Sequence, residues 1–272
     1  MNFTERLRVT QQKRNSLLCV GLDTDLRKIP RSLRGSPDPV LQFNKQIIRA
    51  TRDLVCAYKI NLAFYEAMGG HGWRTLHRTL SHIPEDVITI GDAKRGDIGH
   101  SSGFYAFALL EEYRFSACTV NPYMGMDSVA PFLKNTSQGA FILALTSNPG
   151  ARDFQHLKIR GAPLYEHVIR AVQRWNTKQN CGLVVGATRP KDLRRIRALA
   201  PHMPFLIPGV GAQGGDLQLA VRYGCDAHGE LAVINSSRGI LYASGRGDFA
   251  EAARTAAITM RDEINAHRDR FF

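Results

Sequence analysis

The chain has 272 residues, of which 44% are hydrophobic and 22% charged, a balance typical of a globular protein with a buried core. No apolar run reaches the roughly 18–20 residues that a membrane-spanning helix needs, and the amino terminus lacks the basic-then-apolar pattern of a signal peptide. We therefore expect neither a membrane protein nor a secreted one.

The net charge of +12 raises the question of a nucleic-acid partner. The basic residues form short clusters, over residues 27–34 and 189–197, without interleaved aromatic residues and without a helix-turn-helix or RNA-binding signature. A positive field that steers a small anionic substrate fits the charge equally well. We expect no nucleic-acid partner.

The five cysteines are an odd number, and four of them lie within apolar, strand-like runs with no Cys-x-x-Cys spacing. Reduced, buried thiols in a cytoplasmic protein are the simplest interpretation.

In chain order, a strand-then-helix rhythm repeats. Short apolar runs predict strands at residues 16–22, 55–60, 87–91, 117–120, 140–145, 182–186, 205–208 and 231–234. Helical periodicity and capping signals predict helices at about residues 3–14, 40–52, 64–81, 101–113, 163–178, from 190 onward, and 249–267. A longer loop, residues 146–161, follows the fifth strand.

This rhythm predicts the fold class. Near-continuous apolar strands that alternate with helices are typical of a parallel sheet covered by helices. Eight such units in about 250 residues have the size of a (β/α)₈ barrel. We expect a single barrel domain over residues 1–272, with a short helix at about 3–14 in front, because no linker or composition shift divides the chain. A doubly wound open sheet is the alternative.

The segment Asp92-Ala-Lys-Arg-Gly-Asp-Ile-Gly99 follows the third strand and carries an unusual group of charges. Alternation along the strand places Asp92 and Lys94 on one side, close enough to pair, and Asp97 follows on the connecting loop. Charges near a core cost several kcal/mol each unless they are paired or used. A structural salt bridge would explain an isolated Asp-x-Lys, but the third charge and the flanking glycines favour a functional site.

Other polar residues also fall at strand ends, where the active sites of (β/α)₈ barrels lie. They are Asp23 after the first strand, Lys59 and Asn61 at the second, and Thr146 and Ser147 after the fifth. Taken singly, Asp23, Asn61 and Thr146 are equally good helix caps. Lys59 ends an apolar strand and needs a counter-charge, which Asp92 on the neighbouring strand supplies.

Glycine-rich loops follow the seventh and eighth strands, at residues 208–216 and 235–239. In many such barrels these two loops bind phosphate through backbone N–H groups. Gln213 and Arg238 are predicted to add an amide donor and a guanidinium donor. After the seventh strand, a Gly-x-Gly-x-x-Gly spacing fits a monophosphate site, with a purely structural turn as the alternative; its glycines are Gly209, Gly211 and Gly214.

Histidine and cysteine add no site of their own. The histidines have no metal-ligand spacing, and no Ser-His-Asp or Cys-His arrangement is present. We expect no metal site and no cofactor.

Together these segments resemble the orotidine 5′-monophosphate decarboxylase family, over nearly the whole barrel from residue 19 to residue 242. The most specific match is residues 92–98, which fit the family signature Asp-x-Lys-x-x-Asp-Ile. Residues 59–66 and 209–215 are similar to the longer-chain bacterial branch. The resemblance implies cofactor-independent decarboxylation of orotidine 5′-monophosphate to uridine 5′-monophosphate and CO₂, the final step of de novo UMP synthesis.

The resemblance also implies a homodimer in the cytoplasm and a role for individual residues. Lys59, Asp92, Lys94 and the partner's Asp97 would form an alternating charged network, and Ile98 would also reach into the partner's site. Asp23 and Lys59 would hold the ribose hydroxyls, Ser147 the pyrimidine edge, and Gln213 and Arg238 the phosphate. The further substrate-binding residues that it implies are Asn61, Ile98, Ser101, Thr146, Gly211 and Gly214.

Two positions depart from the family pattern. Ile60 stands where relatives often have proline, and Ser101 where threonine is usual. The first change bears on how the second strand ends, and the second keeps the hydroxyl.

The residues fit the implied chemistry. Loss of CO₂ from C6 of orotate leaves a carbanion with no adjacent electron sink, so preorganised charges must stabilise it. The Lys94 ammonium is placed to neutralise the developing charge and then to protonate C6. Asp92 and Asp97 would keep Lys94 charged and aimed.

Two rival functions remain at this point. A sugar-phosphate lyase or decarboxylase of the same barrel superfamily would hold Mg²⁺ with a carboxylate at the end of the second strand, but Lys59 stands there and would repel the metal. A basic nucleic-acid-binding protein would show salt-dependent binding that survives the loss of Lys94.

Overall fold

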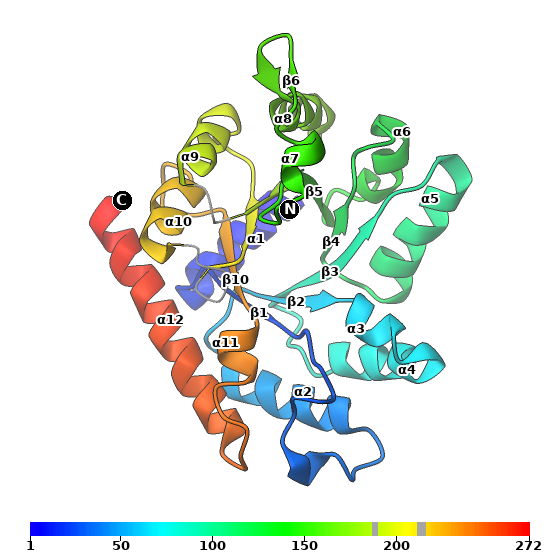
Figure 1. Ribbon diagram of the computed structural model, residues 1–272, viewed down its shortest axis with the longest axis vertical. Coiled ribbons are helices and arrows are strands. Elements are labelled where there is room, and N and C mark those ends of the chain that lie inside the picture. The colour runs from blue at the N-terminus through cyan, green and yellow to red at the C-terminus, as the bar shows by residue number, and fades with distance from the viewer. Residues whose placement is uncertain (187–189, 211–215) are drawn as a thin grey trace.

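The computed structural model describes residues 1–186, 190–210 and 216–272. Eight strands close into a barrel in the order β1-β10-β9-β8-β5-β4-β3-β2, and every neighbouring pair is parallel (Figure 1). The predicted (β/α)₈ barrel is confirmed. The strands are β1 (Leu18–Gly21), β2 (Ala57–Asn61), β3 (Ile88–Arg95), β4 (Ala117–Val120), β5 (Gly139–Leu145), β8 (Cys181–Val185), β9 (Phe205–Pro208) and β10 (Ala232–Ser236).

Helices surround the barrel (Figure 1). The longer ones are α2 (Pro39–Thr51), α4 (Gly69–Leu80), α5 (Gly99–Ala106), α8 (Leu164–Trp175), α9 (Pro190–Leu199), α10 (Leu217–Gly224) and α12 (Phe249–Phe271). In the described part of the chain, no helix is long and apolar enough to cross a membrane. The buried apolar side chains form two groups, one between the strands and these helices and one inside the barrel.

Helix α1 (Phe3–Arg14) closes the amino end of the barrel. Phe3 and Leu7 belong to the inner apolar group, and Phe3 meets Phe141 of β5 edge-on with 5.8 Å between ring centroids. The Gln11 side chain donates to the Ala232 carbonyl (2.7 Å) and accepts from the Leu231 N–H (2.9 Å), at the start of β10. These contacts leave the carboxyl end as the open end of the barrel.

The single helix predicted at residues 64–81 is wrong, because the chain forms two helices there, α3 (Ala63–Glu66) and α4. The chain turns between them, and Gly69 adopts a φ of +61°, which favours glycine. At Gly72 a Cβ would collide with the Tyr65 carbonyl oxygen, so the two helices can approach this closely only because residue 72 is a glycine.

The helix predicted at residues 101–113 changes type along its length. Helix α5 continues into a π-helix, η2 (Phe107–Glu112), whose last carbonyl groups have no partner within the helix. The Gln138 side chain donates to one of them, the Leu110 carbonyl, at 2.6 Å. This contact comes from a distant part of the chain, which the local periodicity could not reveal.

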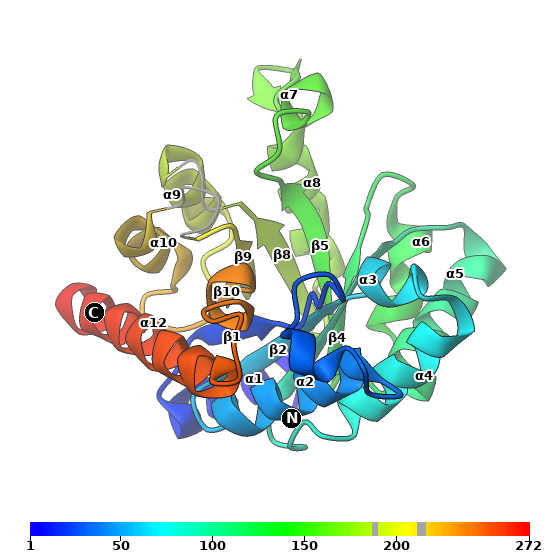
Figure 2. The same ribbon diagram turned by 60° about the horizontal axis from the view of Figure 1, so that its bottom comes forward.

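The predicted loop at residues 146–161 contains regular structure. It holds the short helix α7 (Ala151–Phe154) and strand β6 (Lys158–Ile159), which pairs with β7 (Ala162–Pro163) in a hairpin. This connection projects away from the barrel (Figure 2). Further short elements that the sequence analysis did not specify are η1 (Arg31–Leu33), α6 (Met126–Val129), η3 (Ala130–Leu133) and α11 (Arg238–Leu241).

Candidate active site

A cavity of about 660 Å³ opens at the carboxyl end of the barrel. Its floor is apolar and includes Leu143, Val184 and Leu206, which continue the apolar interior of the barrel. Its walls are polar and come from the residues that end or follow the strands. They include Asp23, Lys59, Asn61, Asp92, Lys94, Thr146, Ser147, Asn235, Ser237 and Arg238.

Four of the predicted residues form one chain of alternating charges in this cavity. Lys59 Nζ lies 3.1 Å from Asp23 Oδ1 and 3.2 Å from Asp92 Oδ2. Lys94 Nζ lies 2.7 Å from Asp92 Oδ1. The Lys59 and Asp92 side chains are buried, whereas the Lys94 side chain is half exposed and faces the open cavity.

Each buried charge is stabilised by its neighbours. Burial alone would lower the pKa of Lys59, but the Asp23 and Asp92 carboxylates outweigh burial and raise that pKa above its usual value. Burial would likewise raise the pKa of Asp92, but Lys59 and Lys94, with a hydrogen bond from Thr119, lower it. Both groups are therefore charged at neutral pH.

Asp23 is held from several sides. Its Oδ1 accepts the Asn61 backbone N–H at 3.2 Å, and its Oδ2 accepts the Ser237 hydroxyl at 2.8 Å. A Cβ at Gly21 would collide with that hydroxyl, so the glycine makes the contact possible. The Asn61 side chain accepts the Ala63 N–H at 3.1 Å and acts as a turn cap in this structure.

The loop after β5 is held by Gln155, which follows α7. Its amide accepts the Thr146 backbone N–H and donates to the Thr146 hydroxyl, each at 2.8 Å. The same hydroxyl donates to Asn148 at 2.6 Å. Thr146 and Ser147 both line the cavity.

The predicted phosphate end is described only in part. Arg238 begins α11, is exposed and lines the cavity together with Gly209 and Val210. The three other residues predicted for this end lie outside the described residues; they are Gly211, Gln213 and Gly214.

Three predicted residues lie outside the cavity of their own chain. Asp97 and Ser101 line a separate hollow on the outer side of α5, and Ile98 is 63% exposed. Asp97 accepts the Ile98 N–H at 2.8 Å. One chain by itself therefore does not bring Asp97 to Lys94.

The sequence analysis missed several polar residues that contact the charged network or its loops. Thr119 contacts both Asp92 and Lys94, Ser237 contacts Asp23, and Gln155 holds Thr146. Ser237 lies in the glycine-rich loop 235–239 and so carried a signal. Thr119 carried none, because Asp92 and Lys94 lie on another strand, and Gln155 carried none, because its contact depends on the fold of the loop that was predicted without regular structure.

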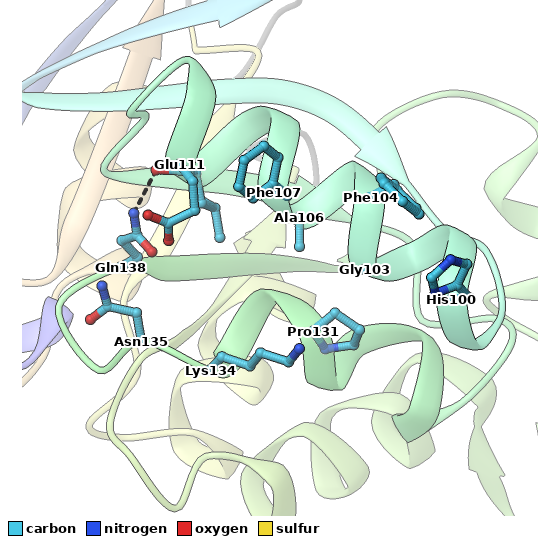
Figure 3. A pocket seen from close by; sticks show the side chains of 11 residues that line it. His100, Gly103, Phe104, Ala106, Phe107, Glu111, Pro131, Lys134, Asn135 and Gln138 are labelled. Carbon is cyan, nitrogen blue, oxygen red and sulfur yellow. Dashed lines mark hydrogen bonds between the residues drawn. The ribbon is translucent and has the colours of Figure 1, made fainter.

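A second cavity, of about 410 Å³, lies outside the barrel between α5, η2 and η3 (Figure 3). Phe104, Phe107 and Pro131 give it an apolar wall, and Glu111 and Lys134 lie at its rim. It contains none of the predicted site residues. In the described part of the chain, no group of three or more His, Cys, Asp or Glu side chains is arranged to hold a metal ion.

Comparison with known proteins links this geometry to one family. Residues 16–255 match the model of the orotidine 5′-phosphate decarboxylase / HUMPS family. An orotidine 5′-phosphate decarboxylase of Dehalococcoides mccartyi is 50% identical over 275 residues, which cover 100% of both chains.

Solved structures give the same result. The structure of Leishmania donovani OMP decarboxylase superposes with a TM-score of 0.87 and 38% identity, over 99% of this chain and 100% of that one. A putative orotidine-monophosphate decarboxylase of Toxoplasma gondii gives a TM-score of 0.92 and 35% identity, over 99% and 98%.

Proposed function

The chain belongs to the orotidine 5′-phosphate decarboxylase / HUMPS family, and from this premise we propose that it converts orotidine 5′-monophosphate to uridine 5′-monophosphate and CO₂ without a cofactor. The similarity to decarboxylases over the full length supports the reaction, and we propose that residues 1–272 act as one catalytic domain. The observation that carries the mechanism is the chain of charges from Asp23 through Lys59 and Asp92 to Lys94.

In the proposed mechanism Lys94 performs the chemical step. When the C6 carboxylate leaves as CO₂, the bonding electron pair stays on C6, and the Lys94 ammonium stabilises that charge before it transfers a proton to C6. Asp92 accepts from Lys94 Nζ at 2.7 Å and holds the ammonium in place. Lys59 is neutralised by Asp23 and Asp92 together, so the charged groups are oriented before the substrate arrives.

The rest of the cavity would bind the parts of the substrate that do not react. We assign the ribose hydroxyls to Asp23 and Lys59, the pyrimidine edge to Ser147, and the phosphate to Arg238 with Gln213. The lining of the cavity supports this assignment, because the charged network, Ser147 and Arg238 line the same space. Binding energy from the remote phosphate can then organise the site for the step at C6.

We propose that two subunits complete each site. Asp97 and Ile98 lie outside the cavity of their own chain, on the loop that leads into α5. Exposed apolar side chains surround this loop, on α5, at the start of η2, and in and just before α6. Helices α5 and α6 lie side by side in Figures 1 and 2. An exposed apolar surface of this kind is typical of an interface. Its large members are Ile98, Phe104, Tyr105, Phe107, Tyr123, Met124 and Met126.

We place the protein in the cytoplasm. All five cysteines are free and buried, which suits a reducing compartment. The biosynthetic reaction proposed above fits the same location.

The test of this function is the loss of orotate absorbance when the purified protein is mixed with orotidine 5′-monophosphate in EDTA. We expect turnover that vanishes in Lys94→Ala, while thermal unfolding of the variant stays close to that of the unchanged protein. Substantial residual activity of Lys94→Ala would contradict the assignment of the proton donor. No turnover in EDTA, with activity on a sugar phosphate after Mg²⁺ is added, would instead support the metal-dependent lyases.

A further inference from the structure

The backbone at Lys94 is irregular. Lys94 has a φ of +48°, in the left-handed region that residues other than glycine rarely adopt. The pairing of β3 with β4 also shifts register here, because Gly91 lies opposite Cys118 whereas Arg95 lies opposite Val120. Three residues of β3 therefore face the single residue Thr119 of β4, which is a bulge in the sheet.

The bulge sets the direction of the Lys94 side chain. In a regular strand the side chains of residues 92 and 94 would project in parallel. Here the left-handed backbone at residue 94 brings Lys94 Nζ back to Asp92 Oδ1, at 2.7 Å. Such strained conformations persist only where surrounding contacts fix them, and they are common at active sites.

The hydroxyl of Thr119 makes two contacts across this bulge. It accepts the backbone N–H of Lys94 at 2.9 Å, a group that the interrupted pairing leaves without a regular strand partner. It donates to Asp92 Oδ1 at 2.9 Å, the same oxygen that accepts from Lys94 Nζ. Thr119 is buried, with 1% of its surface exposed, so water does not replace either contact easily.

We propose that Thr119 is a positioning residue for the decarboxylation, which fixes Lys94 at its backbone and at its ion-pair partner through one hydroxyl. This inference rests on the proposed function and deepens it. Thr119 does not line the cavity in the described structure and would act on the substrate only through Lys94 and Asp92. Its loss should therefore slow the chemical step more than it weakens substrate binding.

The test compares Thr119→Val, which removes the hydroxyl at nearly constant shape, with Thr119→Ser, which keeps it. We expect Thr119→Val to lower kcat on the order of 10²-fold, the effect of a small misplacement of a catalytic group, with little change in KM or in the Kd of uridine 5′-monophosphate. Thr119→Ser should restore most of kcat. Thr119→Ala gives a second variant without the hydroxyl if valine prevents folding.

Thr89→Val is the matched control. Thr89 lies on the same pair of strands, and its hydroxyl accepts the Ser116 N–H at 3.0 Å, but at the end remote from the cavity. We expect this variant to lose thermal stability comparably and to keep its kcat. A purely structural role for Thr119 would give the two valine variants the same small effect on kcat.

The outcomes separate the inference from the function on which it rests. If the unchanged protein turns over orotidine 5′-monophosphate and Thr119→Val keeps its kcat, the positioning role is wrong and the function stands. Equal losses of kcat and of nucleotide affinity, or a failure of serine to restore kcat, would also overturn the positioning role. If the unchanged protein shows no turnover in EDTA, the proposed function fails and the inference fails with it.

Discussion

Lys59 carries a buried positive charge whose side chain is 5% exposed, and it depends on two carboxylates. The raised pKa of Lys59 means that its contribution to stability is complete below the unfolded-state value of about 10.4 and is lost as the pH rises through the higher folded value. The lowered pKa of Asp92 acts oppositely: its contribution is complete above about 3.9 and is lost as the pH falls through the lower folded value. The contributions of Lys59 and Asp92 are therefore both complete from about pH 4 to about pH 10.

Lys59→Met should reveal how the stability contributed by these charges depends on pH, because it removes the cation that lies between Asp23 and the buried Asp92. We expect a loss of about 3–5 kcal/mol in the free energy of unfolding at pH 7. The loss should shrink at pH 5, because Asp92 keeps only Lys94 as a cation, so its pKa rises relative to the unchanged protein and it is protonated more easily in the folded state. Urea unfolding at the two pH values measures this.

A surface pair provides the control for Lys59→Met. Lys13 is exposed and lies 2.9 Å from Asp86, so Lys13→Met should cost less than about 1 kcal/mol, with little change between pH 7 and pH 5. An equal loss for Lys59→Met at both pH values would show that the Asp23 and Asp92 carboxylates do not respond to its removal.

Residue patterns in the sequence predicted part of the site, and the contacts that they did not predict depend on how neighbouring strands pair. The charges of Asp92 and Lys94 lie close together in the sequence, and their pairing could be predicted from it. The regular strand alternation from which this pairing was predicted does not hold at these residues. Instead, a bulge in β3 and the left-handed backbone of Lys94 bring the two side chains together. The role of Thr119 could not be predicted, because it depends on the register between two strands.

At the scale of elements, the helix at residues 3–14 was predicted with its observed bounds, but its role in closing the amino end of the barrel was not predicted. Its amphipathic pattern is weak because the face that packs against the barrel contains the polar Thr10 and Gln11 as well as Phe3 and Leu7. The break between α3 and α4 and the π-helix η2 were missed for a related reason. The close approach of residue 72 to the Tyr65 carbonyl and the bond from Gln138 to the Leu110 carbonyl are packing details that helical periodicity does not encode.

The position of α1 predicts that stability and activity can be changed separately. Phe3 is fully buried against Phe141 at the closed end of the barrel, so Phe3→Ala should cost about 3–5 kcal/mol in the free energy of unfolding. The catalytic network lies at the open end, so kcat and KM should not change well below the melting temperature. Denaturant unfolding and steady-state kinetics on the same sample test both statements.

The control for this prediction lies on the same helix. Val9 is 47% exposed, and Val9→Ala should change stability by less than about 0.5 kcal/mol. A large fall in kcat for Phe3→Ala at a temperature where it is folded would contradict the separation of the two ends.

At the scale of the whole molecule, the barrel could be predicted because its eight strands are apolar along nearly their full length and recur regularly. The net charge of +12 does not by itself specify a partner, because a positive field attracts a small anionic substrate as well as a nucleic acid. Assembly is different, because no pattern within one chain specifies which residues face a second copy.

The proposed dimer makes a prediction that only two different variants together can test. Lys94→Ala and Asp97→Ala should each be inactive alone. In a mixed dimer, one site lacks both groups, whereas the other combines Lys94 of one subunit with the partner's Asp97 and is intact. Random reassociation of equal amounts should therefore restore about a quarter of the original activity, because half of the dimers are mixed and half of their sites are complete.

The matched control replaces Asp97→Ala with Asp92→Ala. Asp92 and Lys94 contact each other within one chain, so mixing their alanine variants creates no intact site and should restore nothing. Co-unfolding in urea, refolding and assay with orotidine 5′-monophosphate would measure both mixtures. Recovery in neither mixture, with dimers present, would mean that Asp97 does not serve the partner's site. Recovery only with Asp97→Ala would show that each site draws its charges from two chains.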